Sequence, residues 1–426
     1  MTAYADLTRD ELLSLKAALE AEYAALAAKG LKLNMARGKP GADQLELSMP
    51  MLDILDAKAD LFASDGTDTR NYGAVNGIPE ARELMGAIAG TPADQTLVLG
   101  SSSLNLMFDA VSHAWTFGVC GGTPWGKLPE VKFLCPVPGY DRHFGITQRF
   151  GIQMINVPLY DDGPDMDLVE QLVASDAAIK GIWCVPKYAN PTGAVYSDQV
   201  VRRFAALKPA ASDFRIFWDN AYAVHHLYDD GAQILNILDE CAAAGNPDLA
   251  YVFCSTSKVT FPGSGLAAFA SSPANVADFA EMVKWQAVCF DKINQLRHVR
   301  FLRDMDGVAE HMRKHAALIR PKFEAVEQTL ERELGGLGIG TWTKPRGGYF
   351  ISFEALPGCA KRIVGLAKDA GVTMTGAGAT YPYKKDPNDS NIRIAPTFPS
   401  ADELAQAAAI FVVCVKLASV CKLLGE

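Results

Sequence analysis

The chain has 426 residues, of which 49% are hydrophobic and 21% are charged, as is typical of a globular protein. A single hydrophobic core stops growing at about 250–300 residues, so a large domain and a smaller one are expected. The formal net charge of −9 argues against binding to nucleic acid, which needs a basic surface.

Nine cysteines are spaced irregularly and form no C-x-x-C pair, which favours buried reduced thiols over disulfides or a zinc site. The N-terminus carries Asp6, Asp10 and Glu11, where a signal peptide would be basic and then apolar. The longest apolar run, Ala407–Val415, is interrupted by Lys416 and is too short to span a bilayer. We therefore expect a soluble cytoplasmic protein without a membrane partner or a bound metal.

The first predicted element is a helix near the N-terminus. Thr8 and Glu11 form a capping-box pattern, apolar residues follow at helical spacing from Leu12 to Tyr23, and Gly30 ends the pattern. Residues 34–50 lack periodicity and are rich in glycine and proline, so we interpret them as a connector that leads into the large domain.

Between about residues 80 and 270, short apolar runs alternate with helical stretches. Runs this apolar are typical of strands buried on both faces, and their alternation with helices predicts an α/β sheet covered on both sides. The predicted strands are Thr96–Leu99, Val131–Cys135, Gln153–Val157, Gly181–Val185, Arg215–Trp218, Ala250–Cys254 and Leu266–Ala270.

After about residue 310 helices are mixed with alternating strands, which indicates a second, α+β domain. Helices are predicted at His311–Glu333, Ala360–Ala370 and Ala401–Leu424, strands at Tyr349–Phe353 and Asn391–Ala395, and an exposed loop at Tyr381–Ser390. The N-terminal helix is expected to pack with this part. We predict a large domain over residues 47–305 and a small domain formed by residues 1–46 and 306–426.

Lys258 follows the predicted strand Ala250–Cys254 and the hydroxyl-bearing run Ser255–Ser257. A lysine at the end of a strand can act as a Schiff-base amine, and the hydroxyl groups beside it can bind phosphate. Taken alone, an exposed loop lysine is the more common case, because lysines are rarely buried.

Asp219 follows the predicted strand Arg215–Trp218, at the edge where α/β sheets bind ligands. Its carboxylate could pair with a protonated ring nitrogen, and Tyr222, three residues later, could donate to a phenolate oxygen. The alternative is an ordinary aspartate in the turn after a strand.

Two turns follow other predicted strands. Ser101, Ser102 and Ser103 lie between a strand and a helix, where backbone N–H groups and the helix dipole bind anions; the alternative is a cluster that only caps the helix. Asn190 begins the turn Asn190–Gly193, where its amide could donate to a hydroxyl group or serve the turn alone.

Arg393 alternates with two isoleucines in the predicted strand Asn391–Ala395. A guanidinium that projects from such a strand can bind a carboxylate with two hydrogen bonds. On the solvent-facing side of an edge strand it would have no such role. All the candidate residues of the large domain follow apolar runs, and this shared position favours one common site.

Together these motifs resemble the class I aminotransferases of the pyridoxal-phosphate fold type I, over about residues 34–400. The resemblance is greatest to the bacterial aspartate aminotransferase subgroup Ic, in the motifs Ala36–Pro40, Asn71–Gly73, Asn76–Glu80, Pro138–Arg142 and Asn294–His298. It implies a large domain with a mostly parallel seven-stranded sheet, the cofactor pyridoxal 5'-phosphate, and a homodimer with shared active sites.

The resemblance also implies roles for single residues. Lys258 would hold the cofactor as a Schiff base and move the proton of the substrate Cα, and Asp219 would pair with the ring nitrogen. The phenolic oxygen would be bonded by Asn190 and Tyr222, the phosphate by Ser101, Ser102, Ser103, Ser255, Ser257 and the partner subunit's Tyr72, with Tyr140 near the ring. The substrate would be bound by Gly38, Lys39, Asn190 and Arg393, the last through the α-carboxylate.

Three positions depart from the pattern of the resembled class. Leu266 stands where an arginine usually binds the phosphate, with Ser264 as a candidate replacement. Val137 aligns with the aromatic residue that stacks on the cofactor, although Tyr140 is close by. The arginine for the distal carboxylate aligns near Cys289, and candidate replacements are Lys39, Lys292, Arg297 and Arg300.

The sequence therefore predicts an aminotransferase that acts on aspartate and 2-oxoglutarate. An aminotransferase of other specificity and a pyridoxal-phosphate-dependent lyase remain alternatives, because one scaffold supports several reactions. A cofactor-sensing regulator would need a DNA-binding module, which the 33 residues before Asn34 do not provide. An unrelated α/β binding protein would not be yellow when purified.

Overall fold

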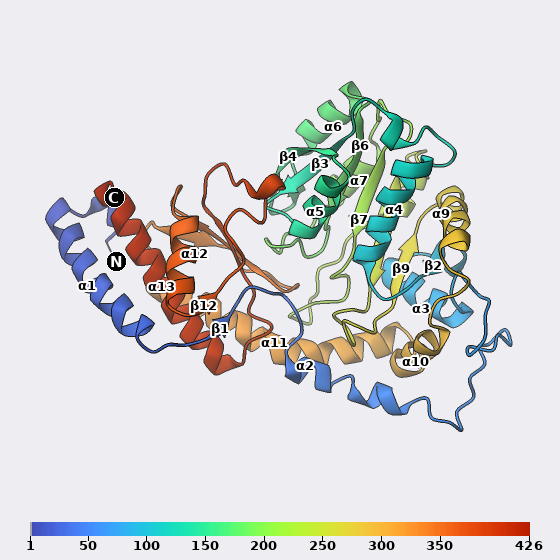
Figure 1. Cartoon of the computed structure of the whole chain (residues 1–426), viewed down its shortest axis with the longest axis horizontal. Coiled ribbons are helices and arrows are strands. Elements are labelled where there is room, and N and C mark those ends of the chain that lie inside the picture. Colours follow the sequence, from blue (N-terminus) through green and yellow to red (C-terminus); the bar gives the residue numbers. More distant parts are fainter. Residues whose placement is uncertain (1) are drawn as a thin grey trace.

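The computed structural model describes residues 2–426 and is built around one large sheet and one small sheet (Figure 1). The large sheet has the strand order β2-β9-β8-β7-β6-β3-β4-β5. Its strands are β2 (Thr96–Val98), β3 (Lys132–Val137), β4 (Gln153–Tyr160), β5 (Gly163–Pro164), β6 (Ile179–Cys184), β7 (Arg215–Asp219), β8 (Ala250–Ser255) and β9 (Ala267–Ala270).

All seven predicted strands are present in the large sheet. The pairs β4–β3, β3–β6, β6–β7 and β7–β8 are parallel, whereas β9 and β5 run antiparallel to their neighbours. The sheet has eight strands and not seven, because the two-residue β5 pairs with the end of β4. An α/β fold with a mostly parallel sheet is thus confirmed.

Helices cover both faces of the large sheet, and alternate residues of β7 contact opposite layers. The helices are α3 (Pro79–Ala89), α4 (Ser103–Phe117), α5 (Asp141–Arg149), α6 (Met166–Ser175), α7 (Asp198–Ala205), α8 (Ile237–Ala243), α9 (Pro273–Gln286) and α10 (Lys292–Leu302). Phe217 packs in a core with α4, α5 and α9, whereas Ile216 and Trp218 pack in a core with α6, α7 and α8. Asp219 therefore belongs to the face of Phe217, and Asn220 to the face of Trp218.

The small sheet is antiparallel and has the order β10-β11-β13. The elements around it are α1 (Arg9–Ala27), β1 (Leu33–Asn34), β10 (Gly340–Trp342), β11 (Ile351–Ala355), α12 (Ala360–Asp369), β12 (Val372–Thr373), β13 (Asn391–Ile394) and α13 (Ala401–Leu424). One core joins Tyr4 near the N-terminus to Leu424 near the C-terminus, and Lys16 pairs with Glu426. The predicted packing of the N-terminal helix with the C-terminal part is confirmed, as is its capping box.

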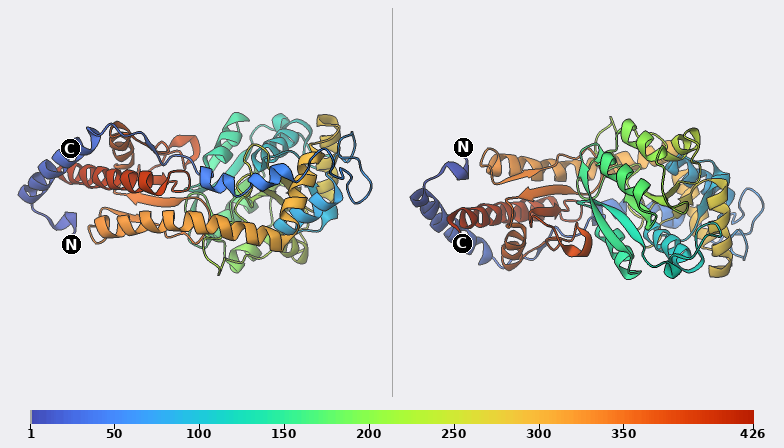
Figure 2. Two further views of the ribbon diagram at one scale, coloured as in Figure 1. Left: turned by 90° about the horizontal axis from the view of Figure 1, so that it is seen from below. Right: turned by 90° about the horizontal axis from the view of Figure 1, so that it is seen from above.

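The long helix α11 (Met305–Leu334) runs along both parts of the molecule (Figure 2). Val308 and Met312 pack in a core with residues of β8 and β9, whereas Ile319 and Phe323 pack in the core beside the small sheet. The predicted domain boundaries at residues 46/47 and 305/306 stay a prediction, since α11 contributes to both cores.

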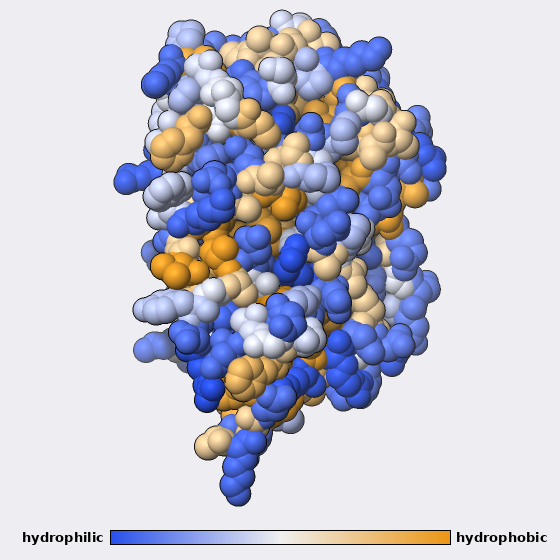
Figure 3. Space-filling view, turned by 90° about the vertical axis from the view of Figure 1, so that its right-hand side faces the viewer, coloured by the Kyte–Doolittle hydropathy of each residue, from blue (hydrophilic) through white to orange (hydrophobic). Residues whose placement is uncertain are grey.

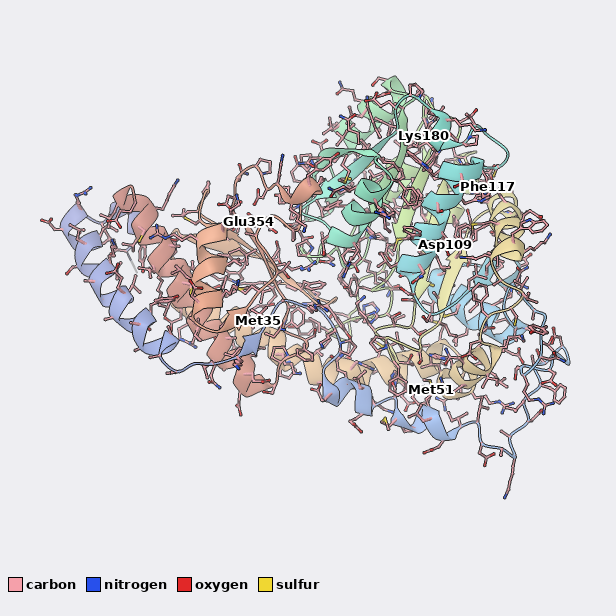
Figure 4. The ribbon with its side chains drawn as sticks, in the orientation of Figure 1. Met35, Met51, Asp109, Phe117, Lys180 and Glu354 are labelled. Carbon is pink, nitrogen blue, oxygen red and sulfur yellow. The ribbon has the colours of Figure 1, made fainter. Side chains whose placement is uncertain are left out.

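The segment from residue 34 to residue 50 is more ordered than the predicted connector. It contains the short helix α2 (Ala42–Glu46), followed by a 3₁₀ turn at Met49–Asp53. Gly41 begins α2, and its N–H donates to the side chain of Gln44 at 3.1 Å. Figure 4 places Met35 beside the small sheet and Met51 below the large sheet, so this segment connects the two parts.

The segment Tyr381–Ser390, predicted to be an exposed loop, is partly fixed. It contains a 3₁₀ turn at Pro382–Lys384, and the Tyr383 hydroxyl accepts a hydrogen bond from the Met154 N–H of β4 at 3.0 Å. Other single 3₁₀ turns lie at Tyr4–Asp6, Ala93–Gln95 and Trp125–Lys127.

The C-terminal helix α13 is long and apolar enough to cross a membrane by length and composition, which the run Ala407–Val415 alone did not suggest. In the structure 78% of its apolar window is buried. It packs against α1, α11 and α12, and Lys416 pairs with Glu333 of α11 at 2.9 Å. Burial inside the protein accounts for the apolar character of this helix.

Candidate active site

Asp219 is the last residue of β7 and is only 2% exposed. His143 of α5 lies 3.0 Å away, from Nε2 to Asp219 Oδ2, and stacks on Trp183 with 4.5 Å between ring centroids. Asp219 Oδ1 is buried and has no hydrogen-bond partner within the described residues 2–426. One carboxylate oxygen is therefore fixed by His143, and the other is left for a donor from outside the chain.

Lys258 follows β8, and its Nζ lies 4.7 Å from the ring centroid of Tyr222. Burial lowers the pKa of Lys258, while the charge of Asp219 opposes this change. Burial also raises the pKa of Tyr222 well above its usual value, so its phenol stays protonated and can donate. The neutral amine of Lys258 is the form that attacks a carbonyl carbon.

The serines predicted to bind phosphate come from two neighbouring segments. Ser102 is the N-cap of α4 and Ser103 is its first residue, and the Ser257 hydroxyl donates to the Ser101 carbonyl at 2.9 Å. Ser255 ends β8. A cavity of about 300 Å³ is lined by Ser101 and by the segment Gly263–Leu266. These hydroxyl groups and the N-terminus of α4 form an arrangement suited to an anion.

Leu266 occupies the position of the missing phosphate arginine. Its side chain is 1% exposed and lies in a hydrophobic core, and its N–H donates to Thr256 Oγ1 at 2.7 Å. Ser264, by contrast, is exposed and lines the same cavity as Ser101. The structure thus offers Ser264, and not Leu266, as a polar group on this side of the site.

Arg393 projects from β13 toward the carboxyl end of β6 and the start of α5. Its Nη1 donates to Asp141 Oδ1 at 2.9 Å and to Asn190 Oδ1 at 3.2 Å, and its Nη2 donates to Thr375 Oγ1 at 3.3 Å. The guanidinium lies 4.8 Å above the ring centroid of Phe350, and its buried Nε has no partner in residues 2–426. Arg393 is therefore a buried cation with unused donor capacity.

Gly38 lies against the Phe350 ring that Arg393 covers, whereas Lys39 contacts Phe398. A Cβ atom on Gly38 would come within 2.3 Å of Phe350 Cζ, the ring that Arg393 covers, so this position requires glycine. Lys39 is exposed, and its Nζ lies 4.0 Å from the ring centroid of Phe398.

The other candidate cations for a distal carboxylate are engaged elsewhere. Lys292 donates to the Asn71 carbonyl at 2.6 Å, Arg297 donates to Asn294 Oδ1 at 2.6 Å, and Arg300 donates to the Asp60 carbonyl. Of the four candidates, Lys39 is thus the one whose amine has no hydrogen-bond partner within residues 2–426 and contacts an aromatic ring instead.

Of the two candidate stacking residues, Tyr140 contacts His143, the hydrogen-bond partner of Asp219. Tyr140 is the N-cap of α5, and its ring centroid is 4.9 Å from that of His143. Burial, with a contribution from Asp219, raises the pKa of Tyr140. Val137 packs in the core on this face of the sheet.

Tyr72 is 78% exposed and is the predicted site residue that a single chain does not bring to the others.

Some neighbours of the site were not predicted. His143 and Thr375 carry no recognisable motif, because each meets its partner only after folding. Asp141 lies inside the motif Pro138–Arg142, but the sequence predicts no role for its side chain. Tyr349, whose hydroxyl donates to the Lys258 carbonyl at 3.3 Å, was expected only as part of a strand.

The site residues fit pyridoxal 5'-phosphate. The unpartnered Asp219 Oδ1 suits a protonated ring nitrogen, the Lys258 amine suits an aldehyde, and the serines beside the N-terminus of α4 suit a phosphate. The hydroxyl of Tyr222 is a donor for a phenolic oxygen.

Comparisons with known proteins agree with this site. The family model for aspartate aminotransferase matches residues 7–426. An aspartate aminotransferase of Corynebacterium glutamicum is 44% identical over 402 residues, which are 94% of this chain and 93% of that protein. The crystal structure of an aspartate transaminase from Corynebacterium glutamicum matches with a TM-score of 0.96 and 42% identity, covering 99% of both chains.

A more distant structure shares the fold. The α-aminoadipate aminotransferase LysN of Thermus thermophilus, complexed with N-(5'-phosphopyridoxyl)-L-leucine, has a TM-score of 0.74 and 19% identity, covering 93% of this chain and 95% of that chain. On the family match and the identity to the Corynebacterium glutamicum protein, the chain is an aminotransferase and belongs to the aspartate aminotransferase family.

Proposed function

We propose that this enzyme transfers the amino group of aspartate to 2-oxoglutarate, with pyridoxal 5'-phosphate bound covalently to Lys258, and that it belongs to subgroup Ic. The observation that carries the proposal is that a buried lysine amine, Lys258, and a buried carboxylate oxygen without a partner, Asp219 Oδ1, follow or end neighbouring strands of one sheet. The 44% identity to an aspartate aminotransferase supports the choice of substrate.

When bound, the cofactor supplies an aldehyde that condenses with amines and a ring that withdraws electrons from the substrate Cα. Asp219 would hold the ring nitrogen through Oδ1, while His143 keeps the carboxylate in place through Oδ2. Tyr222 and Asn190 would donate to the phenolic oxygen. Ser101, Ser102, Ser103, Ser255 and Ser257 would surround the phosphate, and Tyr140 would pack beside the ring.

Lys258 would have two roles in the reaction. Its amine would hold the cofactor aldehyde before the substrate arrives, and would be free once the substrate amino group takes its place. Because burial lowers the pKa of Lys258, the free Nζ would be able to take the proton from the substrate Cα. The same Nζ would then return this proton to the cofactor carbon on the other side of the nitrogen, and water would break the bond between Cα and nitrogen to release the 2-oxo acid.

Arg393 would bind the α-carboxylate of the substrate with two hydrogen bonds. Its Nε is unpartnered, and its Nη1 is shared between Asp141 and Asn190, so a carboxylate can enter by displacing the half-buried Asp141. Lys39 follows Gly38, which lies against the Phe350 ring that Arg393 covers, so we assign Lys39 to the distal carboxylate of aspartate. Gly38 leaves room for the chain to approach the substrate.

We also propose a cytoplasmic homodimer in which Tyr72 reaches the phosphate of the partner subunit. Tyr72 is 78% exposed and lies in the segment before α3. Three other exposed apolar residues lie at the same end of the molecule, in this segment and around α9: Phe62, Trp285 and Val288. Figure 3 looks onto this end, where hydrophobic residues gather in several patches among hydrophilic ones. Such patches are typical of surfaces that bind another protein.

The experiment is reduction of the holoenzyme with borohydride, followed by mass analysis of its peptides, together with a panel of amino donors and oxo-acid acceptors. We expect the reduced cofactor on Lys258, and activity that is highest with aspartate and 2-oxoglutarate. Lys258→Ala should lose both the label and the turnover. The control Lys361→Ala removes a lysine whose side chain is 72% exposed and should keep both. A label on another lysine, or product formed without an added oxo acid, would contradict the proposal.

A further inference from the structure

A second cavity lies on the other face of β7 from Asp219. It has a volume of about 210 Å³ and is lined by Lys187, Trp218 and Asn220 from the strand ends, by Gly90 after α3, and by the segment Gln233–Ile237. Trp218 packs in the core of α7 and α8, whereas Asp219 contacts His143 of α5 on the opposite face. The cavity is therefore separated from the candidate active site by the sheet itself.

Lys187 lines this cavity and is a buried cation without a counter-ion. Lys187 is 6% exposed. No carboxylate oxygen in residues 2–426 lies within 4.0 Å of its amine. Burial lowers the pKa of Lys187 to about 8. A buried charge that has no partner is costly, so a site of this kind favours a ligand of opposite charge.

Three other buried lysines have partners within residues 2–426. Lys180 pairs with Asp213 at 2.5 Å, Lys322 pairs with Asp43 at 3.0 Å, and Lys292 donates to a backbone carbonyl at 2.6 Å. Lys187 differs from these three in that it lines a cavity and its amine has no acceptor within residues 2–426.

The remaining lining of the cavity suits a small polar anion. None of its lining residues is acidic. Asn220 Oδ1 is buried and has no donor within residues 2–426, so it can accept a hydrogen bond from a ligand. The volume corresponds to about seven water molecules, which is enough for a molecule of similar heavy-atom count.

We propose that this cavity binds a small anion that carries its own hydroxyl or amino donor, either a hydroxycarboxylate or a phosphate. Lys187 pairs with the negative group of the ligand, and Asn220 accepts a hydrogen bond from its donor. The walls from Ile88, Trp218 and Val252 limit the length of the molecule. This site is independent of the substrate site at Arg393.

The experiment compares the thermal unfolding midpoint of the holoenzyme in chloride, in inorganic phosphate and in lactate, at equal ionic strength. A ligand that binds only the folded state raises the midpoint, here by about 2 °C or more near saturation. We expect the midpoint of the wild type and of Lys180→Met to rise in one of the two anions. We expect no such rise in Lys187→Met. The anion that gives the rise distinguishes a phosphate ligand from a carboxylate ligand.

Lys180 is a matched control, because it is buried in the strand that leads to Lys187 and lies far from the cavity, near the top of the large sheet in Figure 4. In chloride, Lys187→Met should unfold at a higher temperature than the wild type, and Lys180→Met at a lower one, since the latter removes the cation that pairs with Asp213. An equal rise in the wild type and in Lys187→Met would overturn the proposal.

A second measurement does not depend on a variant. Crystals of the wild-type holoenzyme soaked in arsenate, a phosphate analogue that keeps a hydroxyl group near neutral pH, should give an anomalous peak within hydrogen-bond distance of Lys187 Nζ. Crystals soaked in lactate should give density for the acid at the same place if the ligand is a carboxylate. Absence of both signals would overturn the proposal.

Discussion

At Asp219 the two oxygens of one carboxylate have different surroundings. Oδ2 meets His143 at 3.0 Å, whereas Oδ1 is buried without a partner in the described chain. A buried carboxylate is stable only when its charge is compensated, and His143 provides one of the two contacts that it needs. The second contact is the one that a protonated ring nitrogen would make.

Replacement of this carboxylate tests its role directly. In Asp219→Asn the amide oxygen can still bond His143, but the amide nitrogen would face the ring nitrogen and could not accept its proton. We expect turnover to fall by about 100-fold or more, a loss of the size seen when one electrostatic contact to developing charge is removed. Steady-state kinetics provide the measurement. A folded variant that turns over within threefold of the wild type would contradict the assignment.

At Arg393 the planar shape of the guanidinium matters as much as its charge. Arg393→Lys keeps the cation but loses the two parallel N–H donors that fit a carboxylate. We expect the KM for aspartate to rise by about tenfold or more, which corresponds to about 1.4 kcal/mol, with a smaller change in kcat. Arg346→Lys is the matched control, since Arg346 is exposed, pairs with Asp230 and lies over the ring of Tyr228. An unchanged KM in Arg393→Lys would remove the assigned role.

At the scale of single elements, α13 depends on its first turn. Ser400 caps this helix: its hydroxyl accepts from the Glu403 N–H at 3.3 Å, and Glu403 accepts from the Ser400 N–H at 2.9 Å. Because α13 is buried against α1, α11 and α12, a weaker start of the helix weakens the core that joins both ends of the chain.

Ser400→Ala should therefore lower the free energy of unfolding by about 1 kcal/mol, because it removes the side-chain acceptor of the capping box. Denaturant titration measures this change. Thr329→Ala serves as the control, since Thr329 is a mid-helix hydroxyl on the exposed side of α11 that bonds only the Ala325 carbonyl. Equal stability of Ser400→Ala and the wild type would show that the cap contributes nothing.

Elements that are long and buried were predictable from sequence, and short ones were not. The strands of the large sheet follow from apolar runs, because a strand covered on both faces needs hydrophobic residues at successive positions. β5, β10 and α2 escaped prediction because each is only two to five residues long, which is too short to show a periodic pattern.

The same limit applies to the candidate site. Lys258 and Asp219 were predictable because each follows a recognisable strand and belongs to a motif. His143 was not, because its partner is 76 residues away, and neither was the contact of Arg393 with Asp141, which are 252 residues apart. Such pairs depend on the topology of the sheet and leave no local pattern in the sequence.

At the scale of the whole molecule, Arg393 and Asp219 come from different sheets. β13 carries Arg393 in the small sheet and β7 carries Asp219 in the large one, while α11 packs in the cores of both parts. The hydrogen bonds of Arg393 to Asp141 and Asn190 fix the two parts relative to each other at this point. The site is therefore a product of how the two parts are joined, and not of either sheet alone.

Tyr72 extends this reasoning to two chains. It is exposed in a single chain, so a role at the phosphate requires a second subunit. If Tyr72 acts in the partner's site, a hybrid of one Lys258→Ala chain and one Tyr72→Ala chain contains one site with both native residues. If Tyr72 acts within its own chain, the same hybrid contains no such site.

We therefore expect activity to return when the two variants are unfolded together and refolded as a mixture. Random pairing makes about half of the dimers hybrids with one native site of two, so recovery should reach about a quarter of the wild-type rate. Each variant refolded alone is the control and should show only its own residual rate. A mixture no more active than the average of those two controls would place Tyr72 outside the partner's site.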